Sequence, residues 1–151
     1  MEDALFTISE IEIRYNPKIP TLRKAQIKSS NDAYRQFMIL LDEHAMNLKE
    51  ESAVLFLNRG NRVIGGYKIS SGGITSTVMD IRIILGTALK CLATGIIIAH
   101  THPSRELKPS KSDIDLTEQL KQACKLMKIT LLDHLIITTE SYYSFEDEGL
   151  L

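Results

Sequence analysis

Three side chains that can bind a metal follow one apolar stretch of the sequence. Residues 95–99 read Gly-Ile-Ile-Ile-Ala, which indicates a buried strand, and His100 and His102 come directly after them. Side chains two positions apart on a strand point to the same face, so the two imidazoles are expected side by side at its end. After a short loop, Asp113 lies on the first turn of a predicted helix, from which it can fold back as a third ligand. Two nitrogens and one carboxylate oxygen, with one position left open, form the ligand set of a catalytic zinc site.

The segment that carries Asp113 also has a simpler interpretation. Ser110 stands three residues before Asp113 and ahead of a helical pattern, which is the spacing of a capping box with Ser110 as the N-cap. On its own, a His-x-His pair on a strand is more often a coincidence or a surface pair. Both motifs at one spacing after a buried strand favour the metal site, and Ser110 can cap the helix while it faces that site.

The complete spacing resembles a known signature. His-x-His, seven residues, Ser, two residues and Asp, ending at Asp113, resembles the JAMM motif of the JAB/MPN metallo-hydrolases. The longer string, in which His-x-His-Pro-Ser is followed by a second Pro-Ser and by Asp113, is similar to the RadC branch of that superfamily. RadC-like matches continue at four further places: Asn58, Gly72 with Gly73, residues 133–137 and residues 143–145. The resemblance covers roughly residues 50–151, and its departures are Thr101 and Arg105, where RadC proteins usually carry Asn and Gly.

The resemblance implies both a fold and an activity. The fold would be an α/β/α arrangement of the JAB/MPN type, a mixed sheet flanked by helices that is related to the cytidine-deaminase fold. The activity would be that of a zinc-dependent metallo-hydrolase, with one Zn²⁺ per chain, which cleaves a peptide or isopeptide amide bond by metal-activated water. RadC proteins are traditionally named for DNA repair, so a nucleic-acid-associated module whose metal site has a non-proteolytic role is the alternative.

Metal-assisted hydrolysis also needs a carboxylate that takes the proton of the water and passes it to the leaving amine. In JAMM enzymes a glutamate on an upstream strand has this role, and counting back from Asn58 along the RadC-like pattern leads to Glu50. Strict alternation along the strand puts Glu51 on the opposite face, which makes it the second choice. Both glutamates can instead be solvated residues at the start of the strand. The resemblance further implies that the Ser110 hydroxyl donates to the developing oxyanion.

Length, charge and cysteine content favour one domain in a reducing compartment. A chain of 151 residues fits a single unit over residues 1–151, and its net charge of −1 gives no overall attraction to nucleic acid. Cys91 and Cys124 lie far apart in helical patterns and form no Cys-x-x-Cys pair, so reduced core cysteines are expected. The acidic start of the chain shows no signal peptide, and no apolar stretch is long enough for a membrane span. These features predict a cytoplasmic protein.

Hydrophobic patterns predict the elements that position the site. An edge strand is expected at 9–15 and a polar connector at 17–30, so residues 1–34 would hold no helix-hairpin-helix module like that of longer RadC proteins. Helices are expected after residues 30–32, from Asp80 to about Leu92, and over 112–127. Strands are expected at 53–57, 62–70, 95–102, 129–138 and 142–145, with a hairpin turn at 58–61.

Other polar residues fit other roles better. His134 lies inside a predicted strand and is expected to be a hydrogen-bonded core histidine, whereas His44 is expected at the surface. Ser104 is not in a Gly-x-Ser-x-Gly elbow, and Gly72-Gly73 lacks the pattern of a phosphate-binding loop. The His-x-Glu and Pro-Cys-x-x-Cys motifs of a zinc deaminase are missing from the sequence.

The expected partner is a peptide or protein substrate of unspecified identity, with no membrane and with direct DNA binding weak or absent. Support for DNA binding is limited to basic residues near the site and in the connector: Arg105, Lys108, Lys111, Lys18, Arg23, Lys24 and Lys28. Such clusters are usually solvated surface, so the peptide substrate is favoured.

Overall fold

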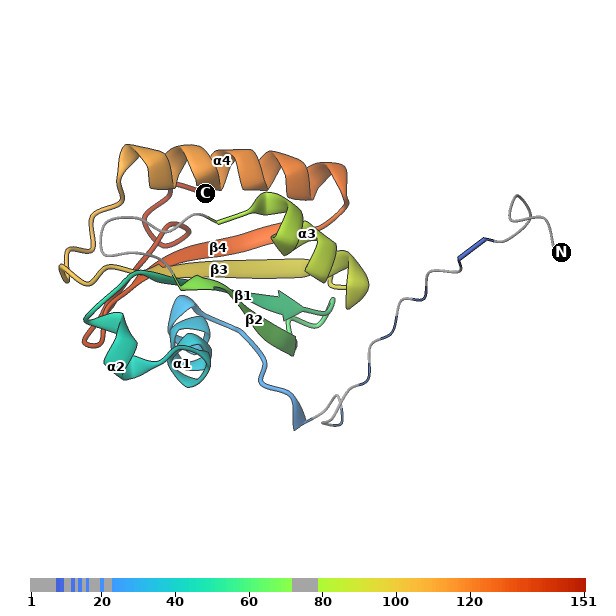
Figure 1. The fold of residues 1–151 in the computed structure, drawn as a ribbon, viewed down its shortest axis with the longest axis horizontal. Helices are drawn as coiled ribbons and strands as arrows, with labels where there is room; N and C mark the ends of the chain where they lie inside the picture. The colour runs from blue at the N-terminus through green and yellow to red at the C-terminus, as the bar shows by residue number, and fades with distance from the viewer. Residues whose placement is uncertain are drawn as a thin grey trace, which may run out of the picture.

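The computed structural model describes residues 8, 9, 12, 14, 16, 20, 23–71 and 79–151 (Figure 1). In these ranges, five strands form one sheet in the order β2-β1-β3-β4-β5. The strands are β1 (Glu51–Leu57), β2 (Val63–Ser71), β3 (Gly95–Thr101), β4 (Thr130–Ile137) and β5 (Tyr142–Ser144). β3 and β4 are parallel and the other neighbours are antiparallel, so the sheet is mixed.

Helices cover both faces of this sheet, as Figure 1 shows. α1 (Ser30–Leu40) and α2 (Glu43–Met46) lie on one face, and α3 (Ile81–Lys90) and α4 (Lys111–Leu126) lie on the other. Within the described ranges, no helix combines the length and the apolar character of a membrane span. The predicted mixed sheet flanked by helices is confirmed and is consistent with a JAB/MPN fold. The relation to the cytidine-deaminase fold and the single domain over residues 1–151 stay predictions.

The two central strands are buried along their whole length. All seven residues of β1 and all seven of β3 are buried, because each strand has neighbours on both sides and helices on both faces. Alternate side chains of these strands enter two separate cores. One core joins Val54 and Ile98 to Leu120 of α4, and the other joins Leu55 to Phe37 of α1. The same alternation decides which side chains at the strand ends face α4.

The predicted elements from residue 30 onward are confirmed, with small shifts at their ends. Ser29 is the N-cap of α1 and forms a capping box with Asp32. β1 begins at Glu51, before the predicted start at residue 53. β3 ends at Thr101, but the His102 backbone N–H still donates to the carbonyl of Ile137 at 3.2 Å, so the pairing with β4 continues to the second histidine.

The predicted edge strand at 9–15 lies largely outside the described residues. The structure describes Ser9, Glu12 and Arg14 of this segment, and none of the three is in a strand. The later part of the connector lies against the β1–β2 hairpin, where Gln26 forms an isolated antiparallel bridge with Arg62. The predicted break at Gly72-Gly73 falls outside the described residues, directly after the last residue of β2.

Candidate metal centre

The three predicted metal ligands lie together at one end of the sheet. His100 is in β3, His102 follows directly after this strand, and Asp113 is in the first turn of α4. The Nε2 atoms of the two histidines are 2.9 Å apart, and Asp113 Oδ1 is 3.3 Å from His100 Nε2. Asp113 Oδ2 is 3.8 Å from His102 Nε2. One donor atom from each side chain lies within 4.8 Å of the others, so the three converge on one point.

The connection from β3 to β4 brings these ligands together. It is a parallel crossover through α4, so the helix begins near the end of β3, where the chain leaves the sheet. The loop turns back at once, with the Arg105 N–H donating to the His102 carbonyl at 2.9 Å. Arg105 has a φ of 63°, in the left-handed region that favours glycine. The glycine that RadC proteins usually carry at this position suits that backbone conformation.

Each histidine uses its Nδ1 atom for a hydrogen bond that points away from the site. His102 Nδ1 is 2.6 Å from the Glu106 carbonyl oxygen, and His100 Nδ1 is 2.8 Å from His134 Nε2. A carbonyl oxygen only accepts, so His102 carries a proton on Nδ1 and, as a neutral ring, turns the lone pair of Nε2 toward the site. Hydrogen bonds of this kind orient the imidazoles of metal sites. Nε2 is therefore the atom that each ring offers to a metal.

The donor set fits zinc. Two imidazole nitrogens and one carboxylate are ligands that zinc uses, and three protein ligands leave a coordination position for a water or a substrate. The side chains of His100, His102 and Asp113 are 4%, 15% and 16% exposed, so the site is largely shielded yet reachable from solvent. Electron pairs from three side chains meet here, an arrangement that a divalent cation stabilises.

The Asp113 carboxylate is held in its ionised form. Burial alone would raise its pKa, but the neighbouring His100 ring and the hydrogen bonds from Ser110 lower the pKa well below its usual value. The Ser110 backbone N–H donates to Asp113 Oδ2 at 2.8 Å. A carboxylate must be deprotonated to bind a metal, and Asp113 meets this requirement at neutral and mildly acidic pH.

Ser110 has the capping role of the simpler interpretation and also lines the site. Its Oγ accepts from the Asp113 N–H at 3.1 Å, and the Asp113 side chain accepts from the Ser110 N–H, so the predicted capping box is present. Ser110 Oγ also lies 2.9 Å from Ser112 Oγ. Capping uses only a lone pair of Ser110, so its hydroxyl proton stays available for donation.

The ligands open onto a hollow of about 350 Å³. Apart from the three ligands and Ser110, its lining residues are Glu50, Met79, Ser104, Glu106, Lys108, Ser112 and Leu116. Two carboxylates other than Asp113 therefore border the hollow. Glu106 is exposed on the loop, whereas Glu50 is partly buried directly before β1. Glu50 is thus the better shielded of the two acids.

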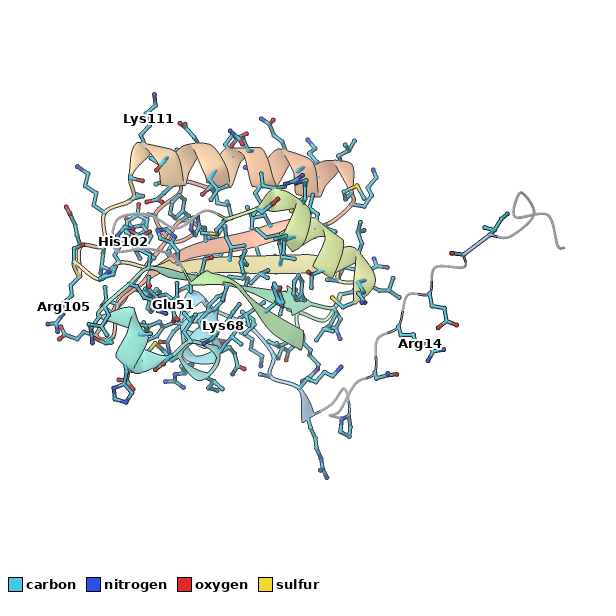
Figure 2. All side chains as sticks on the ribbon, in the orientation of Figure 1. Arg14, Glu51, Lys68, His102, Arg105 and Lys111 are labelled. Carbon is cyan, nitrogen blue, oxygen red and sulfur yellow. The ribbon has the colours of Figure 1, made fainter. Side chains whose placement is uncertain are left out.

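The register of β1 against β3 separates Glu50 from Glu51. Ser52 pairs with His100, so Ser52 and Glu50, two positions earlier, lie on the face of the metal ligands. Glu51 lies on the other face, the side of α1 and α2, as Figure 2 shows in relation to His102. Glu51 is only 4% exposed, and its Oε2 atom has no hydrogen-bond partner among the residues that the structure describes. The structure brings Glu50, and not Glu51, to the hollow.

His134 contributes to the site in a way that the sequence patterns missed. It is fully buried and hydrogen-bonded, as predicted, but its partner is the metal-ligand candidate His100. Its other ring nitrogen, Nδ1, is 2.6 Å from Thr117 Oγ1 on α4. Burial and the nearby His100 and His102 rings lower the pKa of His134 well below its usual value, so the ring is neutral. The signal in the sequence was its place in the RadC-like string 133–137.

The remaining candidates lie apart from the metal-binding atoms. His44 is exposed in α2, as predicted. Cys91 and Cys124 are free thiols, also as predicted. Of the basic residues near the site, Arg105 forms an exposed ion pair with Glu140 at 3.3 Å, and Lys111 points outward from the start of α4 (Figure 2).

Known proteins share this chain's sequence over most of its length. A UPF0758 protein of Flavobacterium johnsoniae is 43% identical over 129 residues, and one of Porphyromonas gingivalis is 41% identical over 130 residues. A UPF0758 protein of Streptococcus sanguinis is 35% identical over 145 residues. These similarities cover 85%, 85% and 95% of this chain but only 55%, 56% and 62% of the three relatives. The chain therefore spans little more than half the length of the curated relatives that it matches.

A family comparison covers the whole candidate site. The profile of the RadC-like JAB domain matches residues 27–150, which include the metal-ligand candidates, Glu50 and Ser110. The fold, the His-His-Asp cluster and this match agree with one another. The chain belongs to the RadC-like JAB domain family.

Proposed function

We propose that this domain is a zinc-dependent hydrolase that cleaves a peptide or isopeptide amide bond by metal-activated water. Its family suggests a metal-dependent hydrolase of the JAMM type. The observation that carries the proposal is the convergence of His100, His102 and Asp113 on one point, beside a hollow that Glu50 and Ser110 also line.

His100, His102 and Asp113 would hold the metal. Zinc at this position would supply a Lewis acid that polarises the scissile carbonyl and lowers the pKa of a water molecule toward neutrality. The protein's part is to keep the three donor atoms oriented. The Glu106 carbonyl and the His134 ring hold the two imidazoles, and the Ser110 N–H holds the Asp113 carboxylate.

Glu50 would handle the protons of the reaction. Its position on the metal-ligand face, directly before β1, supports a role in which the carboxylate takes a proton from the attacking water and passes it to the leaving amine. Partial burial keeps such a carboxylate less hydrated than the exposed Glu106. Glu51 is on the opposite face and would have no access to substrate.

Ser110 would stabilise the negative charge that develops on the substrate oxygen. Its hydroxyl lies at the N-terminus of α4, where the helix dipole also favours negative charge. Because the Asp113 N–H fixes Oγ through the cap, the hydroxyl group is positioned before the substrate binds. A donor that needs no reorganisation during the reaction is the effective kind of oxyanion stabiliser.

Cleavage of peptide and isopeptide libraries by the zinc-loaded chain tests the proposal. We expect products from hydrolysis of an amide bond, and we expect His102→Ala to lose zinc and cleavage together. His44→Ala is the matched control, since it removes an exposed histidine of α2 outside the hollow, and it should retain both. A zinc-loaded wild-type chain that cuts neither library, or a His102→Ala variant that cuts equally fast, would contradict the proposal.

Direct DNA binding has less support as a second function. Arg105 is already ion-paired with Glu140, and the net charge of the chain is −1. We predict that double-stranded DNA binds at best weakly, because few phosphate contacts are available and salt weakens each of them. A gel-shift assay at physiological salt measures this affinity. A sub-micromolar dissociation constant would favour the nucleic-acid-associated alternative.

A further inference from the structure

His134 lies behind the metal-ligand candidate His100, within the core. Its ring is fully buried and stacks on Phe145, with 4.5 Å between ring centroids and 16° between the planes. Its Nε2 atom is 2.8 Å from His100 Nδ1, and its Nδ1 atom is 2.6 Å from Thr117 Oγ1. Stacking and two hydrogen bonds leave the ring one orientation.

The protons along this chain of hydrogen bonds have a defined direction. Thr117 Oγ1 is also 2.6 Å from the backbone carbonyl oxygen of Asp113. A carbonyl oxygen cannot donate, so the single hydroxyl proton of Thr117 points to Asp113, and Thr117 Oγ1 must accept from His134 Nδ1–H. A fully buried ring is expected to carry a single proton, so His134 keeps a lone pair on Nε2, which accepts from His100 Nδ1–H.

We propose that Thr117 and His134 are positioning residues that set the tautomer of His100. They hold the His100 proton on Nδ1, so that Nε2 presents its lone pair to the point where Asp113 and His102 also converge. The inference rests on the proposed metal site. It adds a relay that runs from the backbone of one ligand, Asp113, through two non-ligands to the ring of another ligand, His100.

The two metal-ligand candidates differ in what accepts their Nδ1 proton: a backbone carbonyl for His102 and the His134 ring for His100. For His102, a backbone carbonyl receives the Nδ1 proton directly, and the tautomer needs no further partner. For His100, the acceptor is itself a histidine, which can hold its proton on either nitrogen. The Thr117 hydroxyl decides between these two states, because its only proton is donated to the Asp113 carbonyl and it can therefore only accept from His134.

Thr117→Val removes the hydroxyl with little change in shape. The His134 Nδ1–H then has no acceptor in a fully buried position, which favours moving the proton to Nε2, where it can donate to His100 Nδ1. His100 must then carry its own proton on Nε2, the atom needed for the metal. We expect zinc affinity to fall about 10- to 100-fold, the usual effect of losing a partner that orients a ligand. Thr117→Ser keeps the hydroxyl and should restore the affinity.

Thr87→Val is the matched control on a second helix. Thr87 Oγ1 donates to the Ile83 carbonyl at 2.8 Å, four residues earlier, as Thr117 does to Asp113, but the structure shows no histidine contact to it. It therefore reproduces the loss of a helix hydroxyl without the relay. Zinc affinity, measured by competition with a chelator on the full chain, should be unchanged in this variant. Equal losses in the Thr87 and Thr117 variants, or no loss in Thr117→Val, would overturn the proposal.

Nitrogen-15 NMR of the histidine side chains reads the tautomers directly in the metal-free protein. In the wild type we expect His134 to be protonated at Nδ1, and in Thr117→Val at Nε2. His134 protonated at Nε2 in the wild type would overturn the relay without any variant. A wild type that binds no zinc but shows the expected tautomers would instead leave the relay standing and contradict the proposed function.

Discussion

The start of β1 lies beside the end of β3, and here the two faces of the sheet carry similar residue types. Only one of these faces opens onto the hollow. On the α4 face, Glu50, His100 and His102 line a hollow and direct polar atoms into it. On the α1 face, Glu51 and Thr101 are buried, and they alternate with those residues along the chain. Neighbouring residues of one strand thus differ in whether they can reach a substrate. The period of two along a strand, rather than residue type, selects the functional set.

The face without the hollow still supports the other one. Thr101 Oγ1 accepts from the Glu51 N–H at 2.9 Å and lies 3.4 Å from the Lys49 carbonyl. These contacts fix the backbone on both sides of Glu50. Thr101, a departure from the usual RadC pattern, therefore holds in place the segment that carries the proposed base.

The largest expected difference between the faces concerns the two glutamates. Glu50→Gln should lower hydrolysis about 10²- to 10⁴-fold while zinc content and fold are retained, because an amide of nearly the same size cannot accept a proton. Glu51→Gln should leave the rate unchanged, because its side chain lies on the opposite face of the sheet from the metal-ligand candidates. Initial rates, metal analysis and urea denaturation measure these effects.

The reverse result would contradict the assigned register. If Glu51→Gln is inactive and Glu50→Gln is normal, Glu51 and not Glu50 lies on the face of the metal-ligand candidates. If both variants match the wild type in an assay that His102→Ala abolishes, no upstream glutamate acts as the base.

A smaller effect is expected at the two capping boxes, one on each face of the sheet. Ser110 caps α4 beside the site, and Ser29 caps α1 on the opposite face with the same pair of capping-box hydrogen bonds. Ser110→Ala and Ser29→Ala should each lower stability by about 1 kcal/mol through loss of the cap. Only Ser110→Ala should also lower turnover, by about 10²- to 10³-fold with zinc retained, because it removes an oxyanion donor. Equal turnover in the two variants would show that Ser110 only caps the helix and does not stabilise the oxyanion.

The smallest effect is expected in the loop between the ligands. Arg105 has a φ of 63°, in the left-handed region. This backbone conformation is higher in free energy for a β-branched residue than for glycine. Arg105→Gly should change the free energy of unfolding by less than about 1 kcal/mol, whereas Arg105→Val should lower it by about 1–2 kcal/mol. Thermal denaturation of the metal-free variants separates the two. Equal stability would show that the loop relaxes out of the left-handed conformation.

Local periodicity was enough to predict most of the fold and the grouping of His100, His102 and Asp113 at one end of the sheet. The apolar run before His100 identified the strand, and the spacing from Ser110 to Asp113 identified the start of α4. The contact between His100 and His134 was not predictable in this way. The two residues are 34 positions apart, and their contact depends on the parallel register of β3 and β4, in which His134 pairs with Ile98. Pairing between distant strands leaves no local pattern in either segment.

The position of the metal tests the central claim most directly. Protein purified without chelator should contain one zinc per chain by elemental analysis. An anomalous difference map at the zinc edge should show one peak bound by His100 Nε2, His102 Nε2 and the Asp113 carboxylate. Metal bound elsewhere, with these three side chains pointing apart, would contradict the account.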